Sequence, residues 1–459
     1  MAELKVYLRS FGCQMNLSDA ERALGLLARH GYEPTVDEAQ ADLLLVNTCA
    51  IREKAEDKLF SLLGEWRQIK RQRPGVILAV MGCVAQEMKD EIRRRNPAVD
   101  VVVGTHNFHE LGDLIEEVRE TRSPITRIGR LRDALPDDLP TIRDGRYHAW
   151  VPVIYGCSYF CSYCIVPFTR GPFQSREPGA IAREVTALLA EGYQEITLLG
   201  QTVDRYGRDL PEPTTLAALL RRLSPLPGLA RIRFLTSHPV DLDLELVQTV
   251  AELPNVMEYF HFPIQSGSDR MLEQMKRQHT VAQYLDKVAM IRQHLPGAAI
   301  SGDLIVGFPG ETEEDFEDTL RIVREVEFDS NNTAAYSIRP WTPAGKRADQ
   351  VPEEVKRDRL ARLNETVAET SLRCNRRLVG SWQEVLVEGP SSKRPGIWTG
   401  RTRGNREIFF PGDPSLEGQI VQVKVASARP FTLRGFVAGR PESWPTDHEP
   451  RVPPVVDLL

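Results

Sequence analysis

The first 120 residues alternate between short apolar runs and longer stretches with helical periodicity. The first helical stretch has Ser18 and Glu21 in capping-box spacing and ends at Gly31. The strand-like runs are Lys5 to Leu8, Asp42 to Val46, Val76 to Val80 and Asp100 to Val103. Such alternation is typical of a parallel sheet covered by helices. We therefore predict a small doubly wound α/β domain over residues 1–120.

The alternation stops over residues 121–147 and resumes over residues 148–375. Arg, Asp and Pro dominate the first stretch, which is typical of a linker. The second contains six strand candidates: Trp150 to Tyr155, Glu195 to Leu199, Arg231 to Thr236, Tyr259 to Ile264, Ile300 to Val306 and Thr333 to Ile338. Right-handed crossovers close such units into a barrel, and six units leave it incomplete. The pattern predicts a partial (β/α)6 barrel whose open side admits a large substrate.

Residues 376–440 change to short alternating strands separated by Gly and Pro. The candidates are Trp382 to Glu388, Ile397 to Arg401, Glu407 to Phe410 and Ile420 to Val425. This pattern predicts a small C-terminal β-barrel. The proline-rich residues 441–459 are typical of a disordered tail.

Composition narrows the classes of protein. The 459 residues suggest about three domains, and 41% hydrophobic content is enough for their cores. No apolar run approaches the roughly 18 residues of a membrane span. Residues 1–10 lack the apolar segment of a secretory leader, so we expect a cytoplasmic chain with reduced thiols and no membrane partner. The formal net charge of -6 argues against a general polyanion binder, so nucleic acid contact requires a local patch.

Six of the seven cysteines form two possible three-thiolate sites. One trio is a short string and the other is dispersed: Cys157, Cys161 and Cys164, and Cys13, Cys49 and Cys83. Three thiolates leave one iron of a 4Fe-4S cluster free to bind a substrate or cofactor. The alternatives for the string are a zinc knuckle, a disulfide or free core thiols. Zinc sites close with four ligands, and no fourth Cys or His follows within thirty residues. Cys374 has no partner pattern and is interpreted as structural.

The dispersed trio falls at the carboxyl ends of predicted strands. Open parallel sheets bind ligands at that edge, where helix N-termini favour the thiolate form. Three cysteines in register there predict one cluster site. The alternative is that they are only packing residues.

The carboxyl ends of the predicted barrel strands also collect polar residues and glycines. The cysteine string follows the first strand, and the next four ends carry Gly200-Gln201, Ser237-His238, Gln265-Ser266-Gly267 and Gly307 to Thr312. Barrel active sites lie at this end. Alone, Gly307 to Thr312 is typical of a Pro-Gly turn before a helix. In register with the cysteines, it predicts backbone close to a small ligand.

The spacing Cys157-x-x-x-Cys161-x-x-Cys164, with Tyr163 before the last cysteine, resembles the signature of radical S-adenosylmethionine enzymes. The resemblance implies a 4Fe-4S cluster whose open iron binds the methionine moiety, and one-electron cleavage to a 5'-deoxyadenosyl radical. It also implies a cofactor lining made of Tyr163, Gln201, Ser237, Gln265, Gly307, Phe308 and Pro309. His238 is a further candidate, although a histidine after a strand is often a polar loop residue.

The first domain resembles methylthiotransferases through Gly12 to Asn16, Asn47 to Glu53 and Gly82-Cys83, and the resemblance extends over nearly the whole chain. Details around Ser18-Asp19 and the run Cys157 to Gly171 resemble the bacterial branch that acts on N6-dimethylallyladenosine in tRNA. They resemble less the branches acting on threonylcarbamoyladenosine or on a ribosomal protein.

This resemblance implies two clusters and two uses of S-adenosylmethionine. A second 4Fe-4S cluster on Cys13, Cys49 and Cys83 carries the sulfur, which one S-adenosylmethionine methylates. A second S-adenosylmethionine supplies the radical that removes hydrogen from the adenine C2, next to the anticodon, where the methylthio group is inserted. No acid or base residue is assigned. The implied partners are tRNA carrying N6-dimethylallyladenosine, an electron donor such as a flavodoxin or ferredoxin, and a sulfur source. We expect a monomer.

Residues 376–440 resemble a TRAM domain, an RNA-binding module, through Gly400 to Thr402 and Asn405 to Glu407. The stretch holds 11 Lys or Arg against 5 Asp or Glu, within an acidic chain. The candidate phosphate contacts are Lys393, Arg394, Arg401, Arg403 and Arg406. The alternative is a solvated charged face.

Two places depart from the family pattern. Gln201 to Asp204 stands where Gln-Asn-Val-Asn is usual, and Trp341 stands where glycine is usual. They leave the predicted chemistry intact and affect only the details of the substrate pocket.

The alternative function from another class of protein is a non-catalytic iron-sulfur or zinc protein that binds RNA. Such a protein would yield no 5'-deoxyadenosine from S-adenosylmethionine under reductant.

Overall fold

The computed structural model describes residues 4–50, 53–129, 136, 137, 139–143, 145–440 and 444. The described chain divides into two units. The first comprises Met1–Val326 and Asn331–Asn364, and the second Glu327–Ser330 and Glu365–Leu459. Apart from Trp444, the tail predicted to be disordered at residues 441–459 lies outside the described residues.

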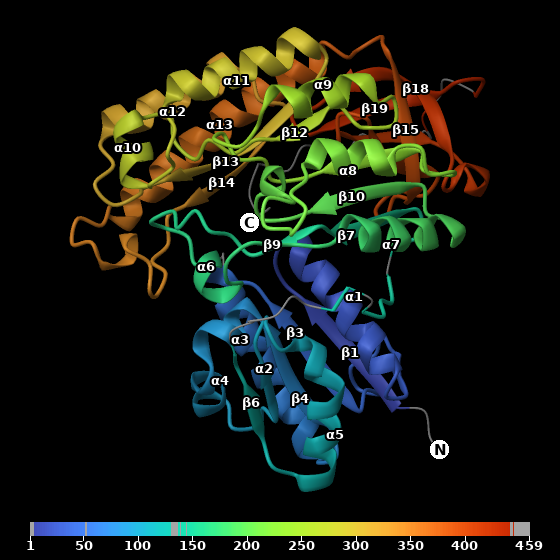
Figure 1. Ribbon diagram of the computed structural model, residues 1–459, viewed down its shortest axis with the longest axis vertical. Helices are drawn as coiled ribbons and strands as arrows, with labels where there is room; N and C mark the ends of the chain where they lie inside the picture. The colour runs from blue at the N-terminus through green and yellow to red at the C-terminus, as the bar shows by residue number, and fades with distance from the viewer. Residues whose placement is uncertain are drawn as a thin grey trace. The chain divides into compact units, whose positions relative to one another are not determined.

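The N-terminal sheet is parallel and has six strands (Figure 1). They are β1 (Leu4–Ser10), β2 (Tyr32–Pro34), β3 (Leu43–Thr48), β4 (Ile77–Gly82), β5 (Val101–Val103) and β6 (Ile125–Arg127), in the order β2-β1-β3-β4-β5-β6. The pattern predicted the four inner strands and missed β2 and β6, which form the edges. β6 lies within residues 121–147, the stretch predicted as a linker. It pairs with β5 over only three residues, which is too short for its pattern to be recognised in the sequence.

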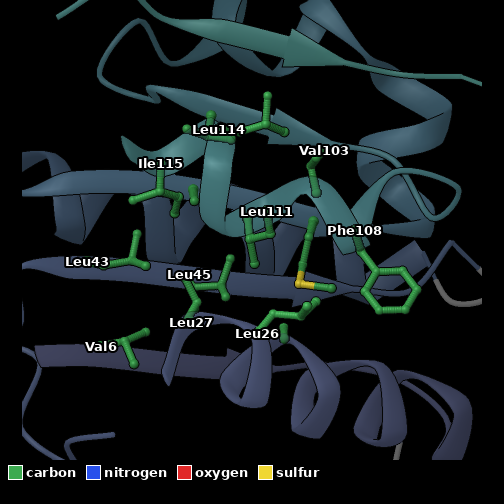
Figure 2. Close-up of a cluster of buried hydrophobic side chains, with 14 of the residues drawn as sticks. Val6, Leu26, Leu27, Leu43, Leu45, Val103, Phe108, Leu111, Leu114 and Ile115 are labelled. Atoms are coloured by element: carbon green, nitrogen blue, oxygen red, sulfur yellow. The ribbon is translucent and has the colours of Figure 1, made fainter. Parts of the chain in front are cut away.

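Helices cover both faces of this sheet because consecutive strand residues point to opposite sides. Leu43 and Leu45 pack with α1 (Gln14–Ala28) and α5 (Leu111–Thr121) on one face, as Figure 2 shows. Their neighbour Leu44 packs with α2 (Glu53–Gln72) and α3 (Cys83–Met88) on the other. The strands β3, β4 and β5 are fully buried on both sides, which explains their continuous apolar sequences. The predicted doubly wound fold is confirmed.

Six strands of the first unit form an open barrel of two three-stranded sheets. One sheet has β7 (His148–Pro152), β10 (Glu195–Leu199) and β11 (Arg231–Phe234), and the other has β12 (Tyr259–His261), β13 (Ala299–Val306) and β14 (Ser330–Ala335). A single parallel bridge between Ile232 and Val256 extends β11 toward β12. The predicted partial barrel of six strands is confirmed.

The remaining described elements are distributed over both units. Helices are α4 (Asp90–Arg95), α6 (Val166–Thr169), α7 (Pro178–Ala190), α8 (Leu216–Leu223), α9 (Leu244–Glu252), α10 (Asp269–Gln274), α11 (Val281–His294), α12 (Glu313–Val326) and α13 (Glu353–Arg376), and β8 (Ile154–Tyr155) pairs with β9 (Gln174–Ser175). Short 3-10 turns occupy Phe108–Glu110, Val203–Arg205, Ala344–Lys346 and Pro414–Leu416. Within the described ranges, no helix combines the length and the apolar character that crossing a membrane requires.

The second unit contains a closed five-stranded barrel. Its strands are β15 (Trp382–Pro390), β16 (Ile397–Thr402), β17 (Glu407–Pro411), β18 (Ile420–Ala428) and β19 (Thr432–Val437), in the order β15-β16-β17-β19-β18. Val385, Ile408, Phe410 and Leu433 are fully buried in its centre. The predicted C-terminal β-barrel is confirmed, and β19 is the strand that the pattern missed.

Leu45→Ala should lower the stability of the N-terminal sheet domain by about 2–5 kcal/mol, because Leu45 is fully buried between β3 and the helices of Figure 2. Hydrogen exchange of the β3 and β4 amides measures this directly. Val36→Ala is the matched control, since Val36 is 98% exposed and should change stability by less than about 0.5 kcal/mol. Equal exchange rates in the two variants would contradict the assigned core.

Candidate functional site

The cysteine string forms a loop between β8 and α6. Gly156 begins the loop with φ of 70°, and a Cβ there would lie 2.1 Å from the Pro172 carbonyl oxygen. The Cys157 amide donates to the Gly171 carbonyl oxygen at 3.0 Å. Only glycine meets both the left-handed backbone and the close approach without strain. This position therefore closes the loop.

The first half of the string contacts the carboxyl ends of β10 and β11. Cys157 Sγ lies 3.7 Å from Thr202 Oγ1, shortly after β10. The Tyr159 ring stacks on His238, after β11, with centroids 3.8 Å apart and an interplanar angle of 12°. The Tyr159 hydroxyl also donates to Asp241.

The second half of the string contacts the ends of β12 and β13. Arg277 Nη1 donates to Cys161 Sγ at 3.6 Å, and its Nη2 donates to the Pro263 carbonyl oxygen at 2.8 Å. Tyr163 packs against the apolar cluster that contains Phe308. Residues 157, 159, 161 and 163 thus approach four successive strand ends.

The thiols of the string repel one another once they ionise. Burial raises the pKa of Cys157 and raises that of Cys164 to about 12, and the charge of Cys161 raises both further. Metal binding overcomes this cost because each thiolate gains a cation. Among the described residues, no three His, Cys, Asp or Glu side chains converge as ligands of a single ion. A four-iron cluster requires a wider arrangement of ligands, because each thiolate binds a different iron.

The predicted cofactor residues Gln201, Ser237, Gln265 and Gly307 follow successive barrel strands. Gln201 Oε1 is buried and has no hydrogen-bond partner among the described residues. Ser237 Oγ donates to Asp204 Oδ1 at 3.0 Å. A buried acceptor without a partner is rare in folded proteins, and it suits a polar ligand at this end of the barrel.

Three of these strand ends have left-handed backbone. Thr236 has φ of 73°, Gln265 of 80° and Gly307 of 69°. A β-branched residue at positive φ is strained, and such strain concentrates at functional sites. The Gln265 amide and carbonyl nonetheless bond to the Asp303 oxygen and the Ile305 amide of β13, each at 3.0 Å. The turn at Gln265 is therefore held by β13.

The loop after β13 is closed by Glu311. The Gly307 amide donates to Glu311 Oε2 at 2.7 Å, and Arg359 Nη1 donates to the same oxygen at 2.7 Å. Phe308 and Pro309 are buried beneath the loop. Phe308 meets Tyr336 edge to face, with centroids 5.5 Å apart.

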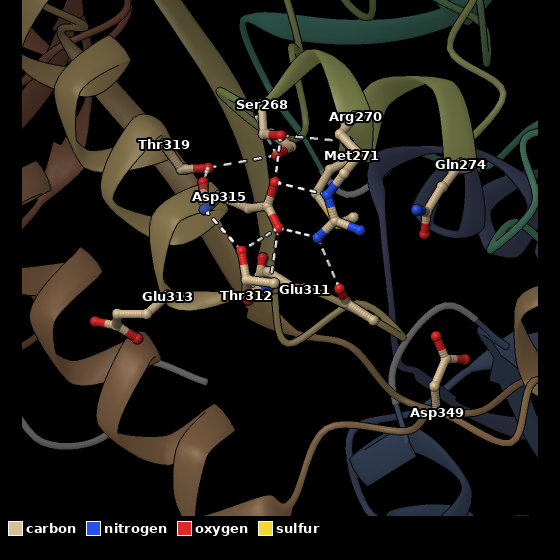
Figure 3. Close-up of polar contacts among 12 residues, drawn as sticks. Ser268, Arg270, Met271, Gln274, Glu311, Thr312, Glu313, Asp315, Thr319 and Asp349 are labelled. Carbon is tan, nitrogen blue, oxygen red and sulfur yellow. Dashed lines mark hydrogen bonds and ion pairs between the residues drawn. The ribbon is translucent and has the colours of Figure 1, made fainter.

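Asp315 joins this loop to the one after β12, as Figure 3 shows. Its carboxylate accepts hydrogen bonds from Ser268 Oγ at 2.6 Å and from the Thr312 amide at 2.8 Å, and it pairs with Arg270. Burial would raise the pKa of Asp315, but the bonds from Arg270, Ser268 and Thr312 outweigh it and hold the pKa well below its usual range. The carboxylate therefore stays charged and fixes both loops.

The dispersed cysteines lie at the carboxyl ends of three adjacent strands. Cys13 caps α1 after β1, Cys49 follows β3, and Cys83 begins α3 after β4. The strand order β1-β3-β4 brings these ends side by side. A hydrogen bond with Cys49 lowers the pKa of Cys13 to about 6, whereas burial raises the pKa of Cys83.

Asn16 connects this trio to its surroundings. Its Nδ2 donates to the Thr48 carbonyl oxygen at 2.9 Å, next to Cys49. Its Oδ1 accepts from Cys13 Sγ at 3.4 Å and from Arg170 Nη2 at 3.2 Å. Asn16 thus holds Cys13 and the backbone before Cys49, and with Cys83 at the end of the next strand the three thiols make a donor set that fits a second cluster.

The predicted RNA contacts lie in the second unit and differ in their surroundings. Lys393 is exposed and Arg394 half-exposed. Arg401 pairs with Glu388 at 3.1 Å, and Arg403 with Glu384 at 3.9 Å. Arg406 is mostly covered; it pairs with Asp329 and donates from Nε to Asn375 Oδ1 at 2.9 Å. These bonds give Arg406 a structural role within the unit.

Sequence reasoning missed the contacts of two residues, one beside the string and one within it. Arg277 follows α10 without a motif, and only its neighbours Lys276 and Gln278, both at positive φ, mark the turn in the structure. Tyr159 belongs to the cysteine motif, but its stacking on His238 has no sequence signal. His238 Nε2 is buried without a hydrogen-bond partner among the described residues.

Three family models match the chain in succession. Residues 5–104 match Uncharacterized protein family UPF0004, residues 151–323 match the Radical SAM superfamily, and residues 376–438 match the TRAM domain.

Two relatives are similar to this chain over nearly its whole length. The chain is 45% identical over 440 residues to tRNA-2-methylthio-N(6)-dimethylallyladenosine synthase of Desulforamulus reducens, covering 95% of this chain and 96% of the relative. It is 45% identical over 435 residues to the synthase of Pelotomaculum thermopropionicum, covering 93% and 96%. The chain belongs to this synthase family. It is a radical S-adenosylmethionine methylthiotransferase, as its motifs predicted.

Solved structures share the fold of this chain. The radical S-adenosylmethionine methyltransferase TsrM of Kitasatospora setae, with tryptophan and a cofactor analogue, has a TM-score of 0.55 at 15% identity and covers 75% of each chain. The same enzyme with cobalamin and a [4Fe-4S] cluster has a TM-score of 0.54 at 14% identity, covering 87% of this chain and 81% of the other. Membership of the radical enzyme family implies one 4Fe-4S cluster and S-adenosylmethionine.

Asp204→Asn should make the stability of this chain less dependent on pH. Burial raises the pKa of Asp204 from 3.8 to about 8, despite hydrogen bonds from the His238 amide and Ser237. Between about pH 4 and 8 the folded chain therefore keeps a proton that the unfolded chain has lost, so stability falls as pH rises. The Tm of the variant, measured by differential scanning fluorimetry, should exceed that of the unchanged chain by a margin that grows with pH. Parallel curves would contradict this assignment.

Proposed function

We propose that this chain inserts a methylthio group at C2 of N6-dimethylallyladenosine in tRNA, next to the anticodon. S-adenosylmethionine serves both as the methyl donor and as the source of the radical. The observation that carries the proposal is the pair of three-thiol sites within one unit, one at the barrel strand ends and one at the sheet edge. Two open clusters suit a reaction that needs both a radical and a sulfur.

The string Cys157, Cys161 and Cys164 would hold the radical cluster. When bound, that cluster supplies the electron that cleaves S-adenosylmethionine to the radical which removes the C2 hydrogen. Gln201 offers its unpartnered oxygen to the cofactor, and Tyr163 with Phe308 forms an apolar wall. The lining by Ser237, Gln265, Gly307 and Pro309 remains part of this proposal.

Cys13, Cys49 and Cys83 would hold the second cluster, which carries the sulfur. Asn16 orients Cys13 and the backbone before Cys49, so two of the three ligands share one positioning group. A thiol with a pKa of about 6 is ready to bind iron at neutral pH.

RNA binding is assigned to the second unit. Lys393 and Arg394 are the better phosphate contacts, because Arg401, Arg403 and Arg406 already pair with carboxylates. An electron donor of the flavodoxin or ferredoxin class and a sulfur source complete the proposal. We place the chain in the cytoplasm and expect it to act as a monomer.

The experiment that tests this function is mass spectrometry of nucleosides from tRNA carrying N6-dimethylallyladenosine. The reconstituted chain is incubated with this tRNA, S-adenosylmethionine and a strong reductant without oxygen. A methylthio adduct on that adenosine supports the proposal. Formation of 5'-deoxyadenosine without the adduct would point to another substrate, and neither product from a loaded chain would favour a binding protein.

Cys161→Ala and Cys49→Ala should separate the two sites. The first should abolish 5'-deoxyadenosine formation, whereas the second should leave that reaction and stop only the methylthio adduct. Both products are quantified from the same incubation. Cys374→Ala is the control with activity retained, because this buried thiol bonds only to backbone oxygens of Glu327 and Phe328 among the described contacts. Loss of 5'-deoxyadenosine in Cys49→Ala with the first cluster loaded would refute the division of roles.

Replacing Lys393 and Arg394 together by Ala should weaken tRNA binding and flatten its salt dependence. Each lost phosphate contact lowers the slope of log K against log salt by about 0.7–0.9. Fluorescence anisotropy with labelled tRNA at several salt concentrations measures the slope. Arg221→Ala, which removes an exposed arginine that pairs with Glu245, is the matched control and should leave the slope unchanged. An unchanged slope in the double variant would move the RNA contact elsewhere.

A further inference from the structure

Arg170 is a buried cation that reaches from the barrel region to the cysteines of the N-terminal sheet. It follows α6, directly before Gly171, whose carbonyl oxygen holds the Cys157 amide. Its side chain is 7% exposed. The guanidinium donates to Asp19 Oδ2 at 2.6 Å and to Asn16 Oδ1 at 3.2 Å.

The charge of Arg170 lies close to the dispersed trio. Asn16 Oδ1, which accepts from Arg170 Nη2 at 3.2 Å, also accepts from Cys13 Sγ at 3.4 Å. The guanidinium is therefore separated from a thiol of the trio by one shared acceptor atom. Asp19, which pairs with the same guanidinium at 2.6 Å and is also buried, places a charge of opposite sign next to it. A cation and an anion thus form a fixed, buried pair beside the site.

We propose that Arg170 is the counter-ion of the sulfur-carrying cluster and sets its reduction potential, while Asn16 and Asp19 hold the guanidinium in place. This inference rests on the proposed function, which assigns a cluster to Cys13, Cys49 and Cys83. A reduced cluster carries one more negative charge than an oxidised one, so a fixed cation nearby favours the reduced form. Burial strengthens the effect because solvent screens little there.

The test isolates the second cluster. Cys157, Cys161 and Cys164 are all replaced by Ala in the full chain, which is then reconstituted with iron and sulfide. A redox titration followed by electron paramagnetic resonance gives the midpoint potential of the remaining cluster. Arg170→Gln and Asp19→Asn are made in this background.

The two variants should move the potential in opposite directions. Without the cation, the ratio of reduced to oxidised cluster at a fixed potential should fall at least tenfold, equivalent to a shift of about 59 mV to lower potential. Without the Asp19 carboxylate, Arg170 keeps its bond to Asn16, and the ratio should rise. A role in packing alone would not produce shifts of opposite sign.

Arg143→Gln is the matched control. Arg143 is 6% exposed and also joins the sheet domain to the barrel region, through Glu21 at 3.2 Å and Glu184 at 2.6 Å. This variant should leave the potential unchanged. If Arg170→Gln retains no iron, Arg170→Lys replaces it: the lysine should restore iron and a potential near that of the background, whereas Asp19→Asn should still raise it.

The outcomes separate this inference from the proposed function. A background protein that binds no iron would overturn the second cluster, and this inference with it. Iron bound normally but with equal potentials in Arg170→Gln, Asp19→Asn and the background would overturn only the role of Arg170. A shift in Arg143→Gln as large as in Arg170→Gln would likewise overturn it, because the effect would then come from the domain contact.

Discussion

The direction of the parallel strands is the constraint on which this structure depends. Parallel strands joined by right-handed crossovers deliver all their carboxyl ends to one edge. In the sheet domain, β1, β3 and β4 are neighbours, so cysteines that are about 35 residues apart in the chain end side by side. In the barrel the same rule gathers the ends of β10 to β13 around one loop. The positions of both cysteine trios therefore follow from the direction and order of the strands.

A short segment couples the two sites. The loop that begins at Gly156 closes through the Cys157 and Gly171 contact, and the next residue back, Arg170, inserts between Asp19 and Asn16. The cysteine string and the surroundings of the dispersed trio are therefore both attached to one constrained turn. A change in the closure of this loop would alter the contacts at both trios.

Sequence patterns predicted the parts of the fold that repeat. The strands β3, β4 and β5 are apolar on both faces, and strand direction places the cysteines at one edge, so sequence patterns predict both trios. The edge strands β2 and β6 have three residues each and are partly exposed. Their hydrophobic pattern is therefore too short to be recognised in the sequence. Arg277 and the pairing of Arg406 with Asp329 depend on contacts between segments far apart in the chain, and no local pattern encodes them.

The bond between Cys13 and Cys49 has a consequence for damage by oxygen. A thiol with a pKa of about 6 is largely a thiolate at neutral pH, and here its partner is the second thiol of Cys49. If this pair holds iron, as we propose, oxygen could oxidise the two sulfurs to a disulfide once the iron is lost. A thiol reductant would then be needed before iron could bind there again.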